Sequence, residues 1–175
     1  MLSLKSLFAP ADPWPLKFRH YSFGVRCYNT QRCSVIYNRF QFASAKALFV
    51  PSGKPASADW RNSWRAGYDG GVKFASPVEV DWSPLDDTEQ HARIDLAQLF
   101  KDRLVRHNVS REEVLENWLA AKANNLVPVD ILMEVNDRTI SVYLTALIFT
   151  KELQIPGNPN SNSRRDLMQV WSRSY

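Results

Sequence analysis

The sequence predicts an α+β domain that consists mostly of antiparallel β-structure, as one sheet or as a sandwich. Three pairs of alternating apolar segments, each joined by a polar turn, predict three hairpins. One capped amphipathic segment, at about residues 110–124, predicts the main helix. The chain has 175 residues, of which 45% are hydrophobic, so it can bury one sizeable core. We expect an irregular arm over residues 1–19 and a single β-rich domain over residues 20–175.

The arm is expected to be stiff and irregular because Pro10, Pro13 and Pro15 interrupt it. Lys5 and these prolines also break the apolar stretch, so no signal-peptide core of about 7–15 residues is present. The sequence contains no apolar run of about 18 residues that would predict a membrane span. We expect a cytoplasmic protein from the chain as it stands, or a periplasmic one if a leader has been removed.

The first predicted hairpin surrounds the segment RCYNTQRC, which holds both cysteines of the chain. If the chain folds back about Thr30, three pairs of apolar residues lie opposite each other. All six residues are odd-numbered, so their side chains point to the same face of the sheet. These pairs are Cys27–Cys33, Val25–Val35 and Phe23–Tyr37.

The two cysteines could form a disulfide or remain a buried thiol pair. Directly opposed residues of an antiparallel pair lie about 4.5–5.5 Å apart at Cα, which suits a disulfide. A reducing compartment would keep them as thiols. Two cysteines and three histidines that share no motif (His20, His91 and His107) do not supply four zinc ligands, and no Cys-x-x-Cys redox motif occurs. We therefore expect neither a metal nor a cofactor.

A loop-rich region follows, with Pro, Gly and Ser in FVPSGKPASAD. Asp59 is placed to cap a short helical turn that puts two tryptophans on one side. The stretch DWRNSWRAGY gathers residue types that dominate interface hot spots: Trp60, Arg61, Trp64, Arg65 and Tyr68. One interpretation is a partner-binding surface, and another is that the tryptophans cap the open end of the sheet as part of the core. Base stacking on these aromatic rings is a further option.

The second predicted hairpin alternates Val78, Val80 and Trp82 with acidic residues, turns at SPLDDT, and returns through Ala92 and Ile94. The following LAQLFKDRLV fits either a short helix or an edge strand. The acidic residues Glu79, Asp81, Asp86 and Asp87 could, with His91, perform acid–base chemistry. The alternative is a solvated strand face and turn, since the spacing of a calcium loop is missing.

The main helix is predicted from the capping box Ser110–Glu113 and from the apolar stripe Val114, Leu115, Trp118 and Leu119. Asn124-Asn125 and Pro128 are expected to end it.

The third predicted hairpin runs from Val129 to Val135, turns at Asn136–Arg138 and returns through TISVYLTALIFT. A polar loop, IPGNPNSNSRR, then offers Asn158, Arg164 and Arg165 as candidate partner-binding residues. The final DLMQVWSRSY is expected to be a strand with Leu167 and Trp171 facing inward. The net charge of +4 is spread along the chain, so nucleic-acid binding is not expected.

Four segments together resemble small bacterial immunity proteins encoded beside type VI secretion toxins. They are HYSFGVRCYNTQRCSVIYN, PVEVDW, MEVNDRTISVY and PGN…RRDLMQVWSRSY, and the resemblance covers about residues 21–175. It implies a non-catalytic inhibitor that neutralises a cognate toxin effector, such as a toxin of the lipase class, by occlusion. In agreement, the sequence lacks a Gly-x-Ser-x-Gly elbow, a His-Glu-x-x-His motif and a Gly-rich phosphate loop. The alternatives are a hydrolase-type enzyme that uses the acidic cluster, or a structural accessory of a secretion system.

Overall fold

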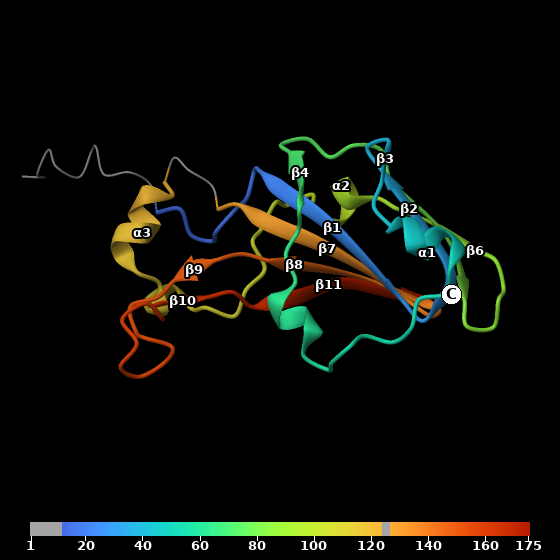
Figure 1. Cartoon of the computed structure of the whole chain (residues 1–175). Coiled ribbons are helices and arrows are strands. Elements are labelled where there is room, and N and C mark those ends of the chain that lie inside the picture. Colours follow the sequence, from blue (N-terminus) through green and yellow to red (C-terminus); the bar gives the residue numbers. More distant parts are fainter. Residues whose placement is uncertain (1–11, 124–126) are drawn as a thin grey trace, which may run out of the picture.

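Two β-sheets packed against each other form the centre of the computed structural model, which describes residues 12–123 and 127–175 (Figure 1). The larger sheet contains β1 (Tyr21–Tyr28), β4 (Tyr68–Gly71), β7 (Val129–Asn136), β8 (Thr139–Thr145) and β11 (Leu167–Ser174). Its strand order is β11-β8-β7-β1-β4. The smaller sheet contains β2 (Thr30–Tyr37), β3 (Phe40–Gln41), β5 (Val78–Pro84) and β6 (Gln90–Ile94), in the order β3-β2-β5-β6. The predicted α+β class with mainly antiparallel sheet is confirmed.

Short elements complete the fold around the two sheets. They are α1 (Ala45–Phe49), α2 (Leu96–Leu99), α3 (Glu116–Ala121), the 3-10 turns η2 (Trp60–Ser63) and η3 (Arg111–Glu113), and the small ladder of β9 (Ile148–Phe149) with β10 (Ser163–Arg164). Among the described helices, none combines the length and the apolar character that crossing a bilayer requires.

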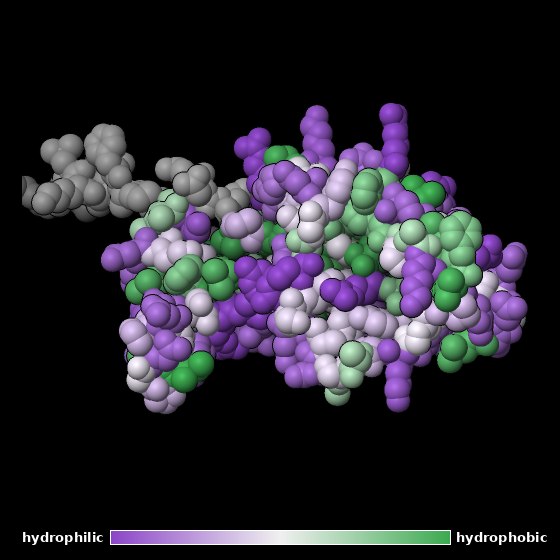
Figure 2. All heavy atoms as spheres, in the orientation of Figure 1, coloured by the Kyte–Doolittle hydropathy of each residue, from purple (hydrophilic) through white to green (hydrophobic). Residues whose placement is uncertain are grey.

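The core lies between the two sheets and takes alternate side chains from each. Phe23 of β1 and Tyr37 of β2 meet across it, with ring centroids 4.9 Å apart. The hydroxyl groups of Tyr21 and Tyr37 lie 2.6 Å apart, so their buried oxygens satisfy one another. On the outside, hydrophilic side chains cover much of the face seen in Figure 2, with hydrophobic patches between them.

The predicted pairing of the first hairpin is wrong. β1 runs parallel to β7 along its whole length and pairs with β4 only at its start, whereas β2 pairs with β3 and β5. Asn29, with a φ of 51°, turns the chain from one sheet to the other. The parity argument did identify the inward side chains of both strands. However, Phe23 and Tyr37 face each other across the core, because each strand buries its apolar face against the opposite sheet.

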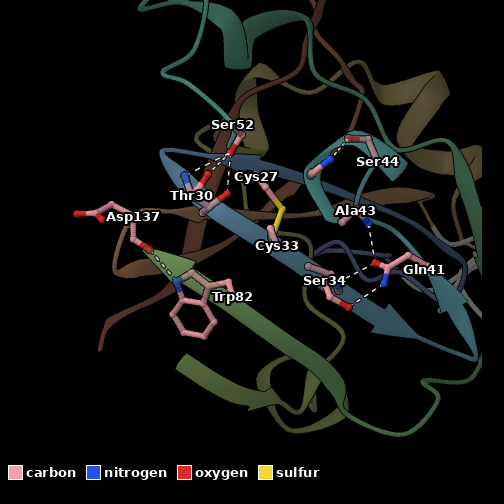
Figure 3. Close-up of a disulfide and its surroundings, with 12 residues drawn as sticks. Cys27, Thr30, Cys33, Ser34, Gln41, Ala43, Ser44, Ser52, Trp82 and Asp137 are labelled. Carbon is pink, nitrogen blue, oxygen red and sulfur yellow. Dashed lines mark hydrogen bonds between the residues drawn. A yellow bond between two sulfur atoms is a disulfide. The ribbon is translucent and has the colours of Figure 1, made fainter. Parts of the chain in front are cut away.

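A disulfide between Cys27 and Cys33 joins β1 to β2 at this corner (Figure 3). The two Cα atoms are 6.5 Å apart, and Cys33 is fully buried beside Trp82 of the neighbouring strand β5. The indole N–H of Trp82 donates to the carbonyl of Asp137 at 2.7 Å, in the turn between β7 and β8. Covalent and hydrogen bonds therefore connect the two sheets at the same end of the sandwich.

The second and third predicted hairpins are confirmed. β5 and β6 pair from Val78↔Ile94 to Trp82↔Gln90. β7 and β8 pair from Asp130↔Thr145 to Asn136↔Thr139. The segment after β6, which fitted either a helix or an edge strand, forms the short helix α2. The side chain of Asp95 caps this helix by accepting a hydrogen bond from the backbone N–H of Gln98 at 3.1 Å.

The predicted main helix is interrupted, so the expectation of one helix over residues 110–124 is wrong. The capping box of Ser110 and Glu113 is present, but it caps only the 3-10 turn η3. Val114 is extended, fully buried and bridged to Thr150, and helix α3 begins only at Glu116. Pairing with the β9 region therefore overrides the local helical preference. The predicted helix end at Asn124-Asn125 lies outside the described residues.

Both ends of the described chain pack on the domain. Of the arm expected over residues 1–19, residues 1–11 lie outside the described residues. Residues 12–19 are irregular, as expected, yet Leu16 and Phe18 are buried in the core. The last segment forms a strand, as predicted. This strand, β11, pairs with β8, with an irregularity in the register before Trp171. Trp171 is half-buried against the core, and Leu167 is half-buried as well.

Loss of the disulfide is expected to destabilise the protein. Reduction, or the double substitution Cys27→Ala/Cys33→Ala, should lower the free energy of unfolding by about 2 kcal/mol, because the crosslink restricts the unfolded chain. Urea unfolding followed by tryptophan fluorescence measures this change. Reductant should have no further effect on the double variant. An intact mass that does not change on reduction would contradict the disulfide.

Candidate functional site

Residues 59–67, here called the strap, cross the outer face of the five-stranded sheet (Figure 1). Their 3-10 turn η2 agrees with the predicted helical turn, although the side chain of Asp59 makes no capping hydrogen bond. Gly24 of β1 lets the strap approach, since a Cβ there would stand 3.2 Å from the Cα of Ala66. The backbone N–H of Ala66 donates to Asp130 of β7 at 3.3 Å. The strap is thus part of the folded domain rather than a free loop.

Arg61 ties the strap to the sheet through a bidentate ion pair with Glu134. Its Nε and Nη2 atoms donate to the two carboxylate oxygens at 2.8 and 2.7 Å. The side chain of Glu134 is only 3% exposed and also accepts from Asn136 at 2.9 Å. Burial disfavours the charged form of Arg61, but the hydrogen bonds to Glu134 and the negative charge of Glu134 favour it. The pKa of Arg61 is therefore raised overall. Arg61 is therefore used inside the domain.

The two tryptophans of the strap differ in exposure. Trp64 is buried, and Trp60 is half-buried, with the two ring centroids 4.9 Å apart. The guanidinium of Arg61 lies 4.8 Å from the Trp60 ring, close enough for a cation–π interaction. Of the residues predicted to bind a partner, Trp64 thus belongs to the packed interior. Trp60, the exposed Arg65 and the half-buried Tyr68 still reach the surface.

The other predicted residues, from the segment after β9, lie in different places. Arg165 approaches Asp130 at 3.5 Å, and its pKa is lowered by burial and by the nearby charge of Arg65. The structure therefore brings Arg165 to the strap.

Arg164 instead pairs with Asp166 at 2.7 Å and approaches Glu113 at 3.7 Å. Asn158 is exposed, and its side chain accepts from the backbone N–H of Asn160 at 3.0 Å, which stabilises its own loop. The side chain of Arg164 thus contacts the region of η3, and that of Asn158 contacts its own loop.

A groove of about 670 Å³ lies between the edge of β1, helix α1, the segment 50–54 and the end of the strap. Consecutive β1 residues, 23–28, form one wall. The opposite wall includes Lys46 of α1 and the segment from Val50 to Lys54. Figure 2 shows hydrophobic residues recessed between hydrophilic ones on this side of the molecule. A groove of this size could hold a short stretch of extended polypeptide.

The lining of this groove contains no carboxylate. It contains four basic residues, which are Arg26, Lys46, Lys54 and Arg65. None of the four forms an ion pair within residues 12–123 and 127–175. Most other surface arginines of the domain do have a carboxylate partner, as Arg32 has in Glu89 and Arg93 has in Glu79. The groove is therefore a concentration of uncompensated positive charge.

Apolar side chains accompany this charge. Phe40, Phe42 and Tyr68 form an aromatic cluster in the lining, with the Phe40 and Tyr68 rings stacked at 5.4 Å. Phe40 and Val50, both in the lining, are about half exposed, at 52% and 44%. Phe49, at the end of α1, is 84% exposed. Basic side chains beside exposed aromatic and aliphatic ones are typical of protein-binding surfaces.

The acidic residues considered for acid–base chemistry are divided between two surface positions. Glu79 and Asp81 of β5 face Arg93 and His91 of β6 on an exposed strand face. Asp86 lies in the turn that follows β5, and its carboxylate accepts hydrogen bonds from Thr88 and from Arg138. These hydrogen bonds lower the pKa of Asp86 to about 2. A carboxyl group with such a pKa stays ionised at neutral pH and is a poor general acid.

Neither position belongs to the groove. Among the described residues, no group of three or more His, Cys, Asp or Glu side chains could hold a metal ion.

The chain matches no protein-family model, no curated protein and no solved structure. The groove is therefore the main guide to function, and sequence reasoning found only part of it. Trp64, Arg65 and Tyr68 were among the predicted residues, whereas Arg26, Lys46 and Lys54 were missed. A useful signal would have been that these three cations have no acidic neighbour within four positions along the chain.

The Arg61–Glu134 pair is expected to be a main stabilising contact of the strap. Arg61→Ala should lower the free energy of unfolding by about 3 kcal/mol, because it leaves the Glu134 carboxylate buried without its partner. Urea unfolding measures the loss. Arg32→Ala, which removes an exposed pair, should cost less than about 1 kcal/mol. The double variant Arg61→Leu/Glu134→Leu should recover part of the stability, and purely additive effects of the two substitutions would contradict the coupling.

Proposed function

We propose that this protein is a non-catalytic immunity protein that binds a cognate bacterial toxin and blocks it by occlusion. The groove carries this proposal, because it combines four basic residues, which have no carboxylate partner in the described part of the chain, with exposed aromatic and aliphatic side chains. A partner that supplies the missing negative charge would gain attraction and specificity on binding. The resemblance of the sequence to type VI secretion immunity proteins supports the same class of function.

The architecture suits an inhibitor that must not change shape. Pairing with β7 and the disulfide hold β1, one wall of the groove, and the backbone hydrogen bonds between Thr30 and Ser52 hold the segment 50–54 in the other wall. A rigid surface loses little conformational freedom when it binds, so more of the contact energy appears as affinity. The alternative of a hydrolase on the acidic cluster has less support, since its carboxylates are exposed and paired with basic side chains.

The disulfide also bears on the compartment. Disulfides persist in oxidising compartments such as the bacterial periplasm and are rare in the cytosol. Of the two locations expected from the sequence, the Cys27–Cys33 bond therefore supports the periplasm. We include a periplasmic site of action in the proposal.

Exchange of the groove charges is expected to abolish partner binding. The tagged protein should retain a stoichiometric partner from its native host, and Lys46→Glu/Lys54→Glu should lose that partner, because both substitutions repel an acidic surface. Affinity purification with mass spectrometry makes the comparison. The matched variant Lys17→Glu/Lys101→Glu changes two exposed lysines outside the groove by the same charge and should retain the partner.

The identity of the partner then tests the function itself. Exported alone to the periplasm of a heterologous bacterium, the partner should stop growth, and export of this protein together with it should restore growth. A retained partner that is harmless when expressed alone would refute the immunity function. Self-association without any other partner would favour the structural alternative.

A further inference from the structure

Most of one edge of strand β1 has no neighbouring strand among residues 12–123 and 127–175. β7 pairs with all eight residues of β1, whereas β4 pairs only with Tyr21, Ser22 and Phe23 on the other edge. In a parallel ladder, every second residue directs its N–H and C=O groups to the neighbouring strand and the others direct theirs to the opposite edge. From Gly24 to Cys27, no described residue accepts from or donates to this second edge. The groove thus contains backbone donors and acceptors in strand geometry.

The free edge is bounded at its far end by the protein itself. Beyond β1, the backbone N–H groups of Asn29 and Thr30 donate to the carbonyls of Gly53 and Ser52, at 3.1 and 3.3 Å. Ser52 thus pairs where an added strand would continue, and β4 pairs where that strand would begin. The open interval between them, Gly24 to Cys27, has the length of a short strand.

The side chains around this interval specify what could pair there. Successive residues of β1 point to opposite sides, so Val25 and Cys27 face inward, and Arg26 faces outward. The guanidinium of Arg26 lies 6.0 Å from the Trp60 ring. A strand added here would direct alternate side chains toward the apolar part of the groove and toward the basic residues.

We propose that the groove binds an acidic, extended segment of the partner protein, which adds as a strand to the free edge of β1 between Gly24 and Cys27. This inference rests on the proposed function, since it names how the partner is held. The missing negative charges would come from acidic residues at alternate positions of the segment, and the positions between them would be apolar.

Two other occupants fit less well. A nucleic acid would satisfy the cations, but phosphates only accept hydrogen bonds and would leave the carbonyl groups of the edge unpaired. The first eleven residues of this chain contain Lys5 and no Asp or Glu, so they would not neutralise the groove. A polypeptide strand supplies both donors and acceptors as well as acidic side chains.

Selection from random peptides displayed on phage tests the inference without knowledge of the partner. Peptides retained by the full-length protein should be enriched in Asp and Glu at every second position. The affinity of a selected peptide should fall by at least about tenfold with Lys46→Glu/Lys54→Glu, and should be unchanged with Lys17→Glu/Lys101→Glu. Selected peptides that are neutral or basic, or that bind both variants equally, would overturn the inference, as would displacement by single-stranded DNA at equal concentration.

The backbone contacts need their own measurement. Methylation of alternate backbone nitrogens on one edge of a selected peptide should abolish binding, whereas methylation on the other edge should not. Hydrogen exchange of the β1 amides should slow when the peptide binds. If neither effect is found, strand addition is wrong. If strand addition fails but binding of the host partner still depends on Lys46 and Lys54, the proposed function stands. If peptides bind as expected and the host partner is harmless, only the immunity function fails.

Discussion

The crossing of the chain at Asn29 determines how the rest of the structure is arranged. Because β1 and β2 enter different sheets at this point, each needs other neighbours, which come from much later in the sequence. β1 takes β7, more than one hundred residues away, as a parallel partner. The disulfide then joins the two sheets rather than two paired strands. The free edge of β1 is a direct consequence, since β2 does not cover it.

A second constraint acts on the outer face of the larger sheet. Glu134 points outward from β7 and would be an isolated buried charge without Arg61. The strap therefore supplies Arg61, which neutralises Glu134, and Trp64, which packs on this face. Its position in turn leaves Arg65 and Tyr68 at the mouth of the groove. Stability and the candidate binding surface thus depend on the same short segment.

Local patterns predicted the parts of the fold that depend on neighbouring residues. The β5–β6 and β7–β8 hairpins follow from alternation and a polar turn, and both formed as expected. The capping box at Ser110 is also present, yet the helix after it breaks because Val114 is held by Thr150. A contact between residues so far apart leaves no local signal, and it outweighed the local preference.

The sequence by itself determined the class of the fold, the inward faces of its strands and the residue types available for binding. Tertiary structure alone decided which strands are neighbours, that Arg61 and Trp64 serve the interior, and that Lys46 and Lys54 face the same groove as Arg65. The physical reason is that alternation fixes only the face to which a side chain points. The partner across that face is chosen by burial and charge compensation over the whole chain.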